Sequence, residues 1–380
     1  MDKDLKMREV QDSDVSKIVK LHNKTYGMDR TVAHWKWEYK GNYPDNFVYG
    51  VIVDKGRIAG TQGMLPIDIN ILGKKHFSGK SESSLLDSDY RGGTLFTDIY
   101  EYTMSLCKDR KMSCVWGFTS AVKVWRHKLN FQVYENDMTD ARIVLNRTAT
   151  FFMNLKSEIR SFYTSWRTKR TTLRKAMGTV WGKLKGGGGG KGESGPPLPK
   201  IDQDIKVSKN YKLENAPRSV KDIELLYKRL RKKYPNLIHM NLDEKYIKWR
   251  IKNNPHINYK HYFVYEGDNL RAYCYFNPKR EKRVAYLSDL TFEDLGAGKF
   301  LLDHLLKELK SQKYAYMNFL GNRSNPMMAL VLSLLQSKGA KLTPNSQAFV
   351  LRNVLYSDEK VLYNMENWYL NGLWTEGHTM

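Results

Sequence analysis

A glycine-containing turn in the first quarter of the chain carries residues suited to hold an anionic ligand. An apolar stretch ends at Leu86, and Arg91-Gly92-Gly93 leads into an apolar helical pattern from Leu95. The amides of a helix start point outward, and the helix dipole reinforces their attraction for a pyrophosphate. Glycines let the backbone approach a ligand closely, and Arg91 adds positive charge. A plain strand-to-helix turn is the alternative. The residues predicted to bind phosphate are Arg91, Gly92, Gly93, Thr94 and Leu95.

The expected strand before this turn carries a carboxylate, Glu82. A carboxylate beside a bound substrate can take up a proton directly or through water, as a general base. Regular alternation would place Glu82 on one face with Ser84 and Leu86, opposite Ser81 and Ser83. A solvated surface glutamate is the alternative.

The chain divides near its middle. A run of five glycines, 186–190, and the Pro-rich sequence after it form a spacer that can bury no core. The sequences on its two sides repeat one another, since Trp37-Glu-Tyr-Lys-Gly-Asn-Tyr-Pro44 matches Trp249-Arg-Ile-Lys-Asn-Asn-Pro255. We therefore expect an N-terminal domain over 1–150, a basic segment and linker over 151–205, and a C-terminal domain over 206–380.

Each unit shows the same order of expected elements. Two helices lead to a β-hairpin, a strand, a long helix, a buried strand, and a closing helix and strand. This alternation predicts an α/β fold with one sheet in each unit. The expected hairpins cover 47–64 and 262–276, the buried strands 113–118 and 314–320, and the closing strands 131–144 and 349–356.

This order and the turn at 85–96 resemble the GCN5-related N-acetyltransferase (GNAT) superfamily, and the doubling resembles its tandem members. The resemblance implies two GNAT-like domains in tandem, each a mixed, mostly antiparallel sheet flanked by helices. It implies an acyl-CoA-dependent N-acyltransferase that uses acetyl-CoA or another acyl-CoA. In the family an unpaired backbone amide on the strand before the turn polarises the thioester carbonyl, which assigns that role to Leu85 or Leu86.

The first unit departs from the family pattern in its loop and in its proton donor. The family loop reads Arg/Gln-x-x-Gly-x-Gly/Ala, and Thr94 and Phe96 stand where small residues are expected. The family's general-acid tyrosine precedes a Lys-Leu-Gly-Phe sequence, but Trp125 occupies that position and cannot usefully protonate a thiolate. His127 and Tyr134 are the remaining candidates for proton transfer, beside Glu82 as base.

The second unit keeps other features of the family. Its loop contains Glu293 and Asp294, whose charges oppose a phosphate, whereas Asn325-Pro326 forms a favourable helix start. We expect the first unit to hold the acyl-CoA and the second to shape the acceptor pocket. Three polar residues lie at expected strand ends: Asp289, Asn318 and Asn322. They either hydrogen-bond the substrate or only cap helices and pack in the core.

Composition narrows the class of partner. The formal charge of +23 calls for an anionic partner such as CoA, a nucleotide-sugar, RNA or anionic lipid. Three cysteines without CxxC spacing predict no metal site and no disulfide framework, and we expect them to be buried. The N-terminus lacks a signal-peptide pattern and no apolar run approaches about 18 residues, so we expect a cytoplasmic protein.

Two further segments have a distinctive composition. Residues 152–185 have the pattern of a basic amphipathic helix. Such a helix has three alternative roles: it binds an anionic membrane surface, it binds nucleic acid, or it packs on the domain. The first outcome would place the protein peripherally at the inner face of the membrane. The aromatic segment 367–374 either lines a pocket or docks on the core.

Three functions compete at this point. The leading one is transfer from acetyl-CoA to an amine on a small molecule, such as an amino sugar used in glycan biosynthesis. A tRNA-dependent aminoacyl transferase, which the doubled units also resemble, would explain the charge. A non-catalytic module that binds acyl-CoA, glycan or membrane is the third.

Overall fold

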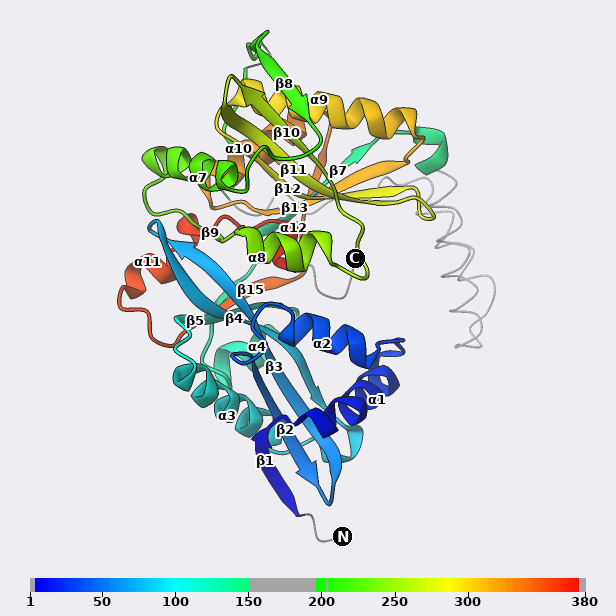
Figure 1. Cartoon of the computed structure of the whole chain (residues 1–380), viewed down its shortest axis with the longest axis vertical. Coiled ribbons are helices and arrows are strands. Elements are labelled where there is room, and N and C mark those ends of the chain that lie inside the picture. The colour runs from blue at the N-terminus through cyan, green and yellow to red at the C-terminus, as the bar shows by residue number, and fades with distance from the viewer. Residues whose placement is uncertain (1–3, 151–195, 203, 376–380) are drawn as a thin grey trace, which may run out of the picture.

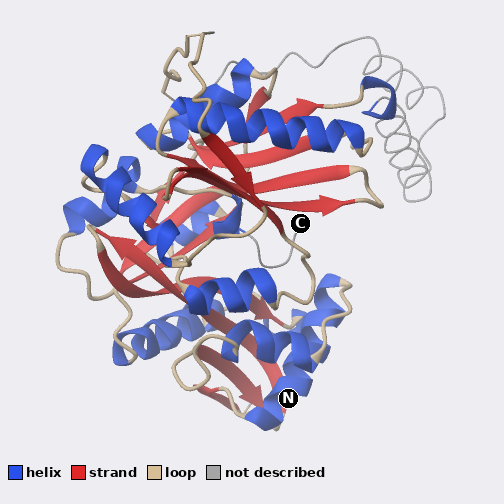
Figure 2. Ribbon diagram, turned by 45° about the horizontal axis from the view of Figure 1, so that its top comes forward, coloured by secondary structure: helices blue, strands red, loops and turns tan. Residues whose placement is uncertain are grey.

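The computed structural model describes residues 4–150, 196–202 and 204–375, which form two mixed sheets flanked by helices (Figures 1 and 2). The predicted α/β architecture with two tandem units, each built on one sheet, is confirmed. The expected basic helix over 152–185 and the glycine run lie outside the described residues. None of the described helices is long and apolar enough to cross a bilayer. The three cysteines are buried, as expected.

The first sheet has eight strands among the described residues, in the order β1-β2-β3-β4-β5-β15-β6, with β9 paired to the end of β3. Its long strands β3 and β4 form a hairpin that reaches the second unit. The strands span Leu5–Glu9 (β1), Val48–Asp54 (β2), Arg57–Ile71 (β3), Lys74–Leu86 (β4), Cys114–Thr119 (β5), Gln132–Tyr134 (β6), Ile238–Met240 (β9) and Ala348–Asn353 (β15).

The second sheet has seven strands in the described part of the chain, in the order β14-β7-β13-β12-β11-β10-β8. Its central strands are the most buried, as the apolar runs predict. The strands span Met138–Val144 (β7), Tyr211–Glu214 (β8), Lys260–Glu266 (β10), Asn269–Lys279 (β11), Val284–Phe292 (β12), Tyr316–Asn322 (β13) and Lys341–Pro344 (β14).

Helices cover both faces of the first sheet. On one face α1 and α2 pack with Trp35 against Tyr49 and Val51 of β2; on the other, α3 packs with Tyr100 against Val48. Strand alternation thus supplies both apolar faces of β2. The helices span Val15–Tyr26 (α1), Val32–Lys40 (α2), Leu95–Asp109 (α3), Val122–His127 (α4), Lys221–Lys233 (α7), Glu244–Tyr246 (α8), Leu295–Ser311 (α9), Pro326–Ser337 (α10), Glu359–Tyr363 (α11) and Gly372–Thr375 (α12).

The two units exchange a strand (Figure 1). β7, from before the linker, pairs with β13 and β14 in the second sheet, and β15 inserts between β5 and β6 in the first. The expectation that 131–144 and 349–356 close the sheets of their own units is therefore wrong. Asn136 has φ 62°, and this left-handed turn splits the first stretch into β6 and β7, which enter different sheets.

The repeated tryptophans meet each other. Trp37 Nε1 donates to the carbonyl of Trp249 at 3.2 Å, and Trp249 Nε1 donates to the carbonyl of Trp37 at 2.7 Å. Such reciprocal contacts are typical of a two-fold relation, in which residue i contacts j and j contacts i. A Cβ at Gly41 would lie 2.6 Å from the Trp249 ring, so this approach requires glycine. The sequence repeat therefore marks an internal two-fold contact.

Candidate active site

The first sheet opens into a V between β4 and β5. These strands pair in parallel at two positions, Gly79 with Val115 and Lys80 with Trp116. Both strands then continue without further pairing to each other. Backbone groups along the end of β4 therefore face a gap instead of a strand, and an extended ligand chain can bond to them as an added strand does.

A β-bulge at Ser83 reshapes the end of β4. Ser83 has φ 55°, which is uncommon for a residue with a side chain, and the register with β3 shifts here. Glu82 and Ser83 both face α1 and α2, whereas Ser81 and Ser84 face α3. The expected alternation, which placed Glu82 with Ser84, is wrong because the bulge inserts one residue.

The amides that face the gap belong to alternate residues of β4. Asp87 donates its N–H to Ala59 of β3 at 2.9 Å, and Leu85, two residues earlier, faces β3 in the same way. The N–H and C=O of Leu86 point to the opposite edge, and its carbonyl accepts a hydrogen bond from Arg91 Nε at 3.2 Å. Of the two candidate oxyanion donors, the amide of Leu86 faces the gap.

Glu82 lies beside this gap with an ammonium and a phenol nearby. Its Oε1 is 2.5 Å from Nζ of Lys80, whose side chain is 4% exposed. Tyr26, at the end of α1, places its hydroxyl 3.4 Å from the backbone oxygen of Ser84. Burial raises the pKa of Tyr26; the charge of Arg91 opposes this shift and that of Glu82 adds to it. Sequence reasoning identified Glu82 and missed both neighbours.

A buried polar network holds the bulge on the α1 and α2 face. Tyr39 donates its hydroxyl to Ser83 Oγ at 2.9 Å, and Thr61 donates to the Ser83 carbonyl at 2.8 Å. Arg30 and Glu38 form a buried ion pair beside them. Buried charges are tolerated only when paired and hydrogen-bonded. The network thus fixes an unusual backbone conformation next to the candidate base.

The loop after β4 leaves its backbone open. Gly92 has φ 98°, and a Cβ on Gly92 or Gly93 would meet no atom within 4 Å. At Gly93 neither packing nor the backbone angle requires glycine. The missing side chains leave the amides before α3 accessible, and Arg91 is exposed beside them. This arrangement suits an anion at the start of α3.

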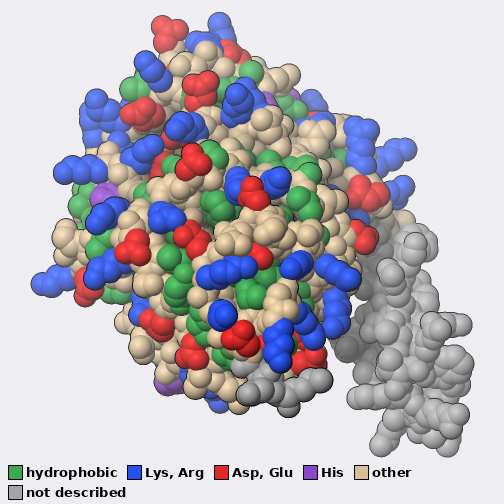
Figure 3. Space-filling view, turned by 60° about the horizontal axis from the view of Figure 1, so that its bottom comes forward, with side chains coloured by type: hydrophobic (Ala, Val, Ile, Leu, Met, Phe, Trp, Pro, Cys, Tyr) green, Lys and Arg blue, Asp and Glu red, His purple; other side chains and the backbone are tan. Residues whose placement is uncertain are grey.

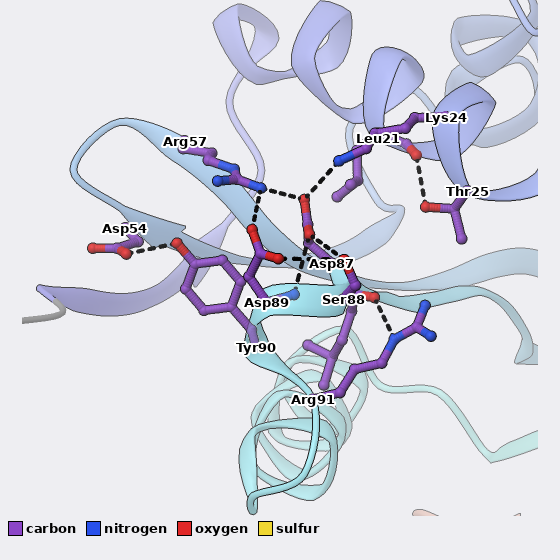
Figure 4. Close-up of polar contacts among 11 residues, drawn as sticks. Leu21, Lys24, Thr25, Asp54, Arg57, Asp87, Ser88, Asp89, Tyr90 and Arg91 are labelled. Carbon is purple, nitrogen blue, oxygen red and sulfur yellow. Dashed lines mark hydrogen bonds and ion pairs between the residues drawn. The ribbon is translucent and has the colours of Figure 1, made fainter. Parts of the chain in front are cut away.

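Acidic side chains tune the charge around the loop. Buried Asp87 binds Arg57 at 2.6 Å and lies 3.8 Å from Lys24 (Figure 4). Burial alone would raise the pKa of Asp87, but the hydrogen bond from Arg57 and the nearby charges lower it below its usual value. Exposed Asp98, in the first turn of α3, accepts the Thr94 hydroxyl at 2.6 Å. Thr94 therefore donates to a carboxylate here.

The other predicted residues of the first unit occupy separate places. Leu95 begins α3 and packs partly into the core with Phe96. His127 is exposed at the end of α4. Tyr134 lies on β6, three strand spacings or about 14 Å from β4, and donates its hydroxyl to the Tyr363 carbonyl at 2.6 Å. The structure does not bring Tyr134 to the gap.

In the second unit the chain itself fills the corresponding gap. β12 and β13 pair over four residue pairs and then separate, and α12 lies against both. A Cβ at Gly372 would lie 3.0 Å from the Cα of Ser288 in β12. Trp368 and Trp374 are buried, and the ring centroid of Trp374 lies 4.7 Å from that of Trp116 in the first sheet. The aromatic C-terminal segment is therefore docked on the core.

Two predicted substrate residues anchor this segment. Asn322 Oδ1 accepts the N–H of Leu370 at 3.0 Å, and Asp289 Oδ1 accepts Asn371 Nδ2 at 2.9 Å. Both side chains are buried, and burial raises the pKa of Asp289 to about 7. Their placement matches the capping and packing alternative.

The third predicted substrate residue, Asn318, lines a cavity of about 270 Å³ in the second sheet. Asp140, Tyr286 and Asn345 line it as well. Asn318 Oδ1 accepts a hydrogen bond from Arg142 Nε at 3.0 Å. Its amide nitrogen is the group left to face a ligand.

The second unit's loop is closed. Asp294 caps α9 by accepting the N–H of Ala297 at 2.9 Å. The backbone carbonyl of Lys206 sits against Gly296, where a side chain would collide with it. Glu293 binds Arg229 at 2.9 Å. The two acids predicted to disfavour phosphate thus have structural roles, one as a helix cap and one in an ion pair.

An acyl-CoA fits the first unit on these observations. The open glycines and Arg91 suit its pyrophosphate, and the unpaired edge of β4 suits its extended pantetheine. In the second unit both places are taken by protein atoms. Asp98, an exposed carboxylate in the first turn of α3, opposes the fit.

Comparison with known domain families gives one match. Residues 6–131 match the acetyltransferase (GNAT) domain, which covers the gap, the loop and Glu82. No curated protein matches the chain in sequence.

Solved structures share the whole architecture. A probable N-acyltransferase from Enterococcus faecalis has a TM-score of 0.57 at 8% identity, covering 93% of this chain and 73% of its own. A GCN5-related N-acetyltransferase from Anabaena variabilis has 0.56 at 11%, covering 92% and 73%. A tandem GNAT protein from the clavulanic acid biosynthesis pathway has 0.50 at 11%, covering 93% and 100%. These likenesses establish the tandem fold.

Proposed function

Since residues 6–131 match the acetyltransferase (GNAT) domain and the chain shares the fold of a tandem GNAT protein, we propose that its first unit transfers an acyl group, most simply acetyl, from CoA to an amine. One observation carries the proposal: the first unit has an open glycine loop beside an unpaired strand edge, and the second unit has neither. A bound acyl-CoA would supply the activated thioester.

The residues around the gap supply the remaining functions. The Leu86 amide is an oxyanion donor in a fixed orientation, which stabilises developing charge. Glu82, oriented by Lys80, accepts the proton of the attacking amine. Tyr26 is the phenol on the same side of the sheet and replaces the missing tyrosine as proton donor to the leaving thiolate.

We favour an acceptor that carries phosphate, such as a nucleotide-linked amino sugar. A cavity of about 350 Å³ lies between α1 and the start of β3, and Lys17, Lys20, Lys24 and Arg57 line it with Asp87 as the only acid among its lining residues. A cavity walled by four cations attracts multiply charged anions. It lies on the same side of the sheet as Tyr26 and α1.

Calorimetric titration with acetyl-CoA, followed by mass spectrometry of a panel of amines, tests the proposal. We expect binding to the full chain and a product heavier by one acetyl group for amines linked to phosphate. Absence of binding at millimolar acetyl-CoA would overturn it. Glu82→Gln should retain binding and lose turnover by about 10²–10⁴-fold.

The tRNA-dependent alternative is tested in the same preparation. Figure 3 shows basic side chains interspersed with acidic ones over one face, without a continuous basic stripe. A tRNA ligand would bind with a steep dependence on salt. If the chain transfers an aminoacyl group from charged tRNA in the absence of acetyl-CoA, the tRNA-dependent function is correct and the proposed acetyl transfer is wrong.

A further inference from the structure

A third cavity, of about 390 Å³, lies where the two units meet, far from the gap between β4 and β5. Its floor is the tip of the β3–β4 hairpin extended by β9, and its walls are α7 and the chain before α8. Lys75, which lines it, precedes Glu82 by seven residues on β4, or about 20 Å. This cavity is thus separate from the proposed transfer site.

Three side chains form a row across the floor. Asn70 of β3 is in register with Lys75 of β4 on one side and with His239 of β9 on the other. Side chains directly opposite in paired strands lie on the same face, so all three point toward the cavity that they line. Lys75 is paired with Asp68 at 3.1 Å and lies 3.7 Å from Asp243.

Arg231 of α7 lines this cavity, and among the described residues it forms no ion pair. Burial lowers the pKa of Arg231, and the charge of Glu224, which also lines the cavity, opposes this shift. Nη1 of Arg231 is 3.3 Å from His239 Nε2. His239 is buried, its Nδ1 donates to the Met240 carbonyl at 2.9 Å, and it stacks on Tyr227 with ring centroids 3.7 Å apart. Burial lowers the pKa of His239 to about 3, so a neutral ring accepts from Arg231. The histidine therefore orients a guanidinium that is still available for an anion.

Asn70 contributes a buried hydrogen-bond acceptor to the same cavity. The residue is 8% exposed, and its Oδ1 has no hydrogen-bond donor among the described residues. A buried acceptor without a donor costs about 1–3 kcal/mol. Among the described residues, the cavity thus presents a guanidinium outside any ion pair, with the Glu224 charge in its surroundings, and on its floor an acceptor without a donor, with the Asp243 carboxylate nearby.

We propose that this cavity binds a free α-amino acid, with its carboxylate on Arg231 and its ammonium facing Asn70 Oδ1 and Asp243. The volume is at the low end of the roughly 300–1,000 Å³ typical of ligand pockets, which suits a molecule of this size. Because the walls come from both units, the ligand also bridges them.

Titration calorimetry of the full chain with each of the twenty standard L-amino acids tests the proposal, with acetate and methylammonium as single-group probes. At least one amino acid should bind saturably, and more tightly than either probe. Arg231→Gln should weaken that binding by about tenfold or more, and Arg231→Lys, which keeps the charge but loses the fork, should weaken it less. Lys232→Gln, the exposed neighbour on α7, is the matched control and should bind as the unchanged chain does.

The proposal is overturned if no amino acid binds at about 10 mM, or if acetate binds as tightly as the best amino acid. It is also overturned if the Arg231→Gln and Arg231→Lys variants bind that amino acid with the same affinity as the unchanged chain. The readout is binding to the folded chain and involves neither CoA nor acyl transfer. Failure of the proposed activity would therefore leave this result unaffected, and the reverse also holds.

Discussion

At the scale of single residues, Gly93 is the sharpest test of the phosphate loop. Nothing lies within 4 Å of its would-be Cβ and its φ is not positive, so a side chain there costs the fold little. A carboxylate would stand where phosphate is expected, and Gly93→Glu should weaken acetyl-CoA binding by tenfold or more, measured by calorimetry. The uncharged Gly93→Gln should weaken it much less. Equal affinity of Gly93→Glu and the unchanged chain would exclude this loop as the phosphate site.

Asp98 gives a prediction of opposite sign. Its carboxylate at the start of α3 stabilises the helix but repels phosphate and engages the Thr94 hydroxyl. Asp98→Asn should tighten acetyl-CoA binding about two- to fivefold at low salt and lower the free energy of unfolding by about 0.3–1 kcal/mol. Asp109→Asn, at the far end of α3, is the control and should leave the affinity unchanged. Weaker binding of Asp98→Asn would contradict this account.

Asp289 predicts a dependence of stability on pH. Its pKa is about 7 in the folded chain and 3.8 ordinarily, so between these values the folded state holds a proton that the unfolded state has lost. The free energy of unfolding should therefore fall as pH rises from about 4 to 7, by about 1.4 kcal/mol per pH unit from this group alone, and level off above 7. Urea unfolding at several pH values measures it. Asp289→Asn should remove this component, and an unchanged slope would refute the assignment.

At the scale of elements, the C-terminal segment seals the second unit. Gly372 has no room for a side chain beside Ser288, and overpacking of this kind costs about 1–3 kcal/mol. Gly372→Val should lower the free energy of unfolding by that amount in urea titrations. Thr375→Ser, which keeps the hydroxyl bonded to the Gly372 carbonyl at 3.0 Å, should change it little. No loss in Gly372→Val would mean that α12 is not packed as described.

Element order was predictable from sequence, and strand partners were not. Hydrophobic periodicity predicted the hairpins and the long helices, which are local patterns. Matching the sequences on the two sides of the linker gave the Trp37/Trp249 repeat. The partners of β7 and β15 depend on pairings across about 200 residues, which periodicity does not encode. Only the Asn136 turn, in a stretch assigned as one strand, was a local sign of the exchange.

The candidate site was predictable to a similar extent. Glycines and charge identified the loop, and Glu82 was found on its strand. Lys80 could also have been predicted, because strand alternation places it on the same face as Glu82, two residues later. Tyr26 was not, since only the packing of α1 brings it to β4. The bulge at Ser83 also escaped, because a positive φ at a serine leaves no sequence pattern.

At the scale of the whole molecule, the exchanged strands make the halves interdependent. If a protease site is introduced within 151–195 and cut after folding, the two fragments should co-elute in gel filtration, because β7 and β15 each remain paired in the other sheet. They should separate only in denaturant. The uncut chain, with the same elution volume, is the control. Separation under native conditions would show that the exchange does not hold the halves together.

The same exchange sets an order of events during synthesis. Chains emerge N-terminus first and their domains usually fold in that order. Here β5 and β6 of the first sheet have no strand between them until β15, at residues 348–353, has left the ribosome. Likewise, β7 has no partner strand until β13 has been synthesised. The first unit, with the glycine loop proposed to bind phosphate, therefore stays incomplete until translation has nearly ended, and a chain truncated before β15 would be a substrate for chaperones and proteases.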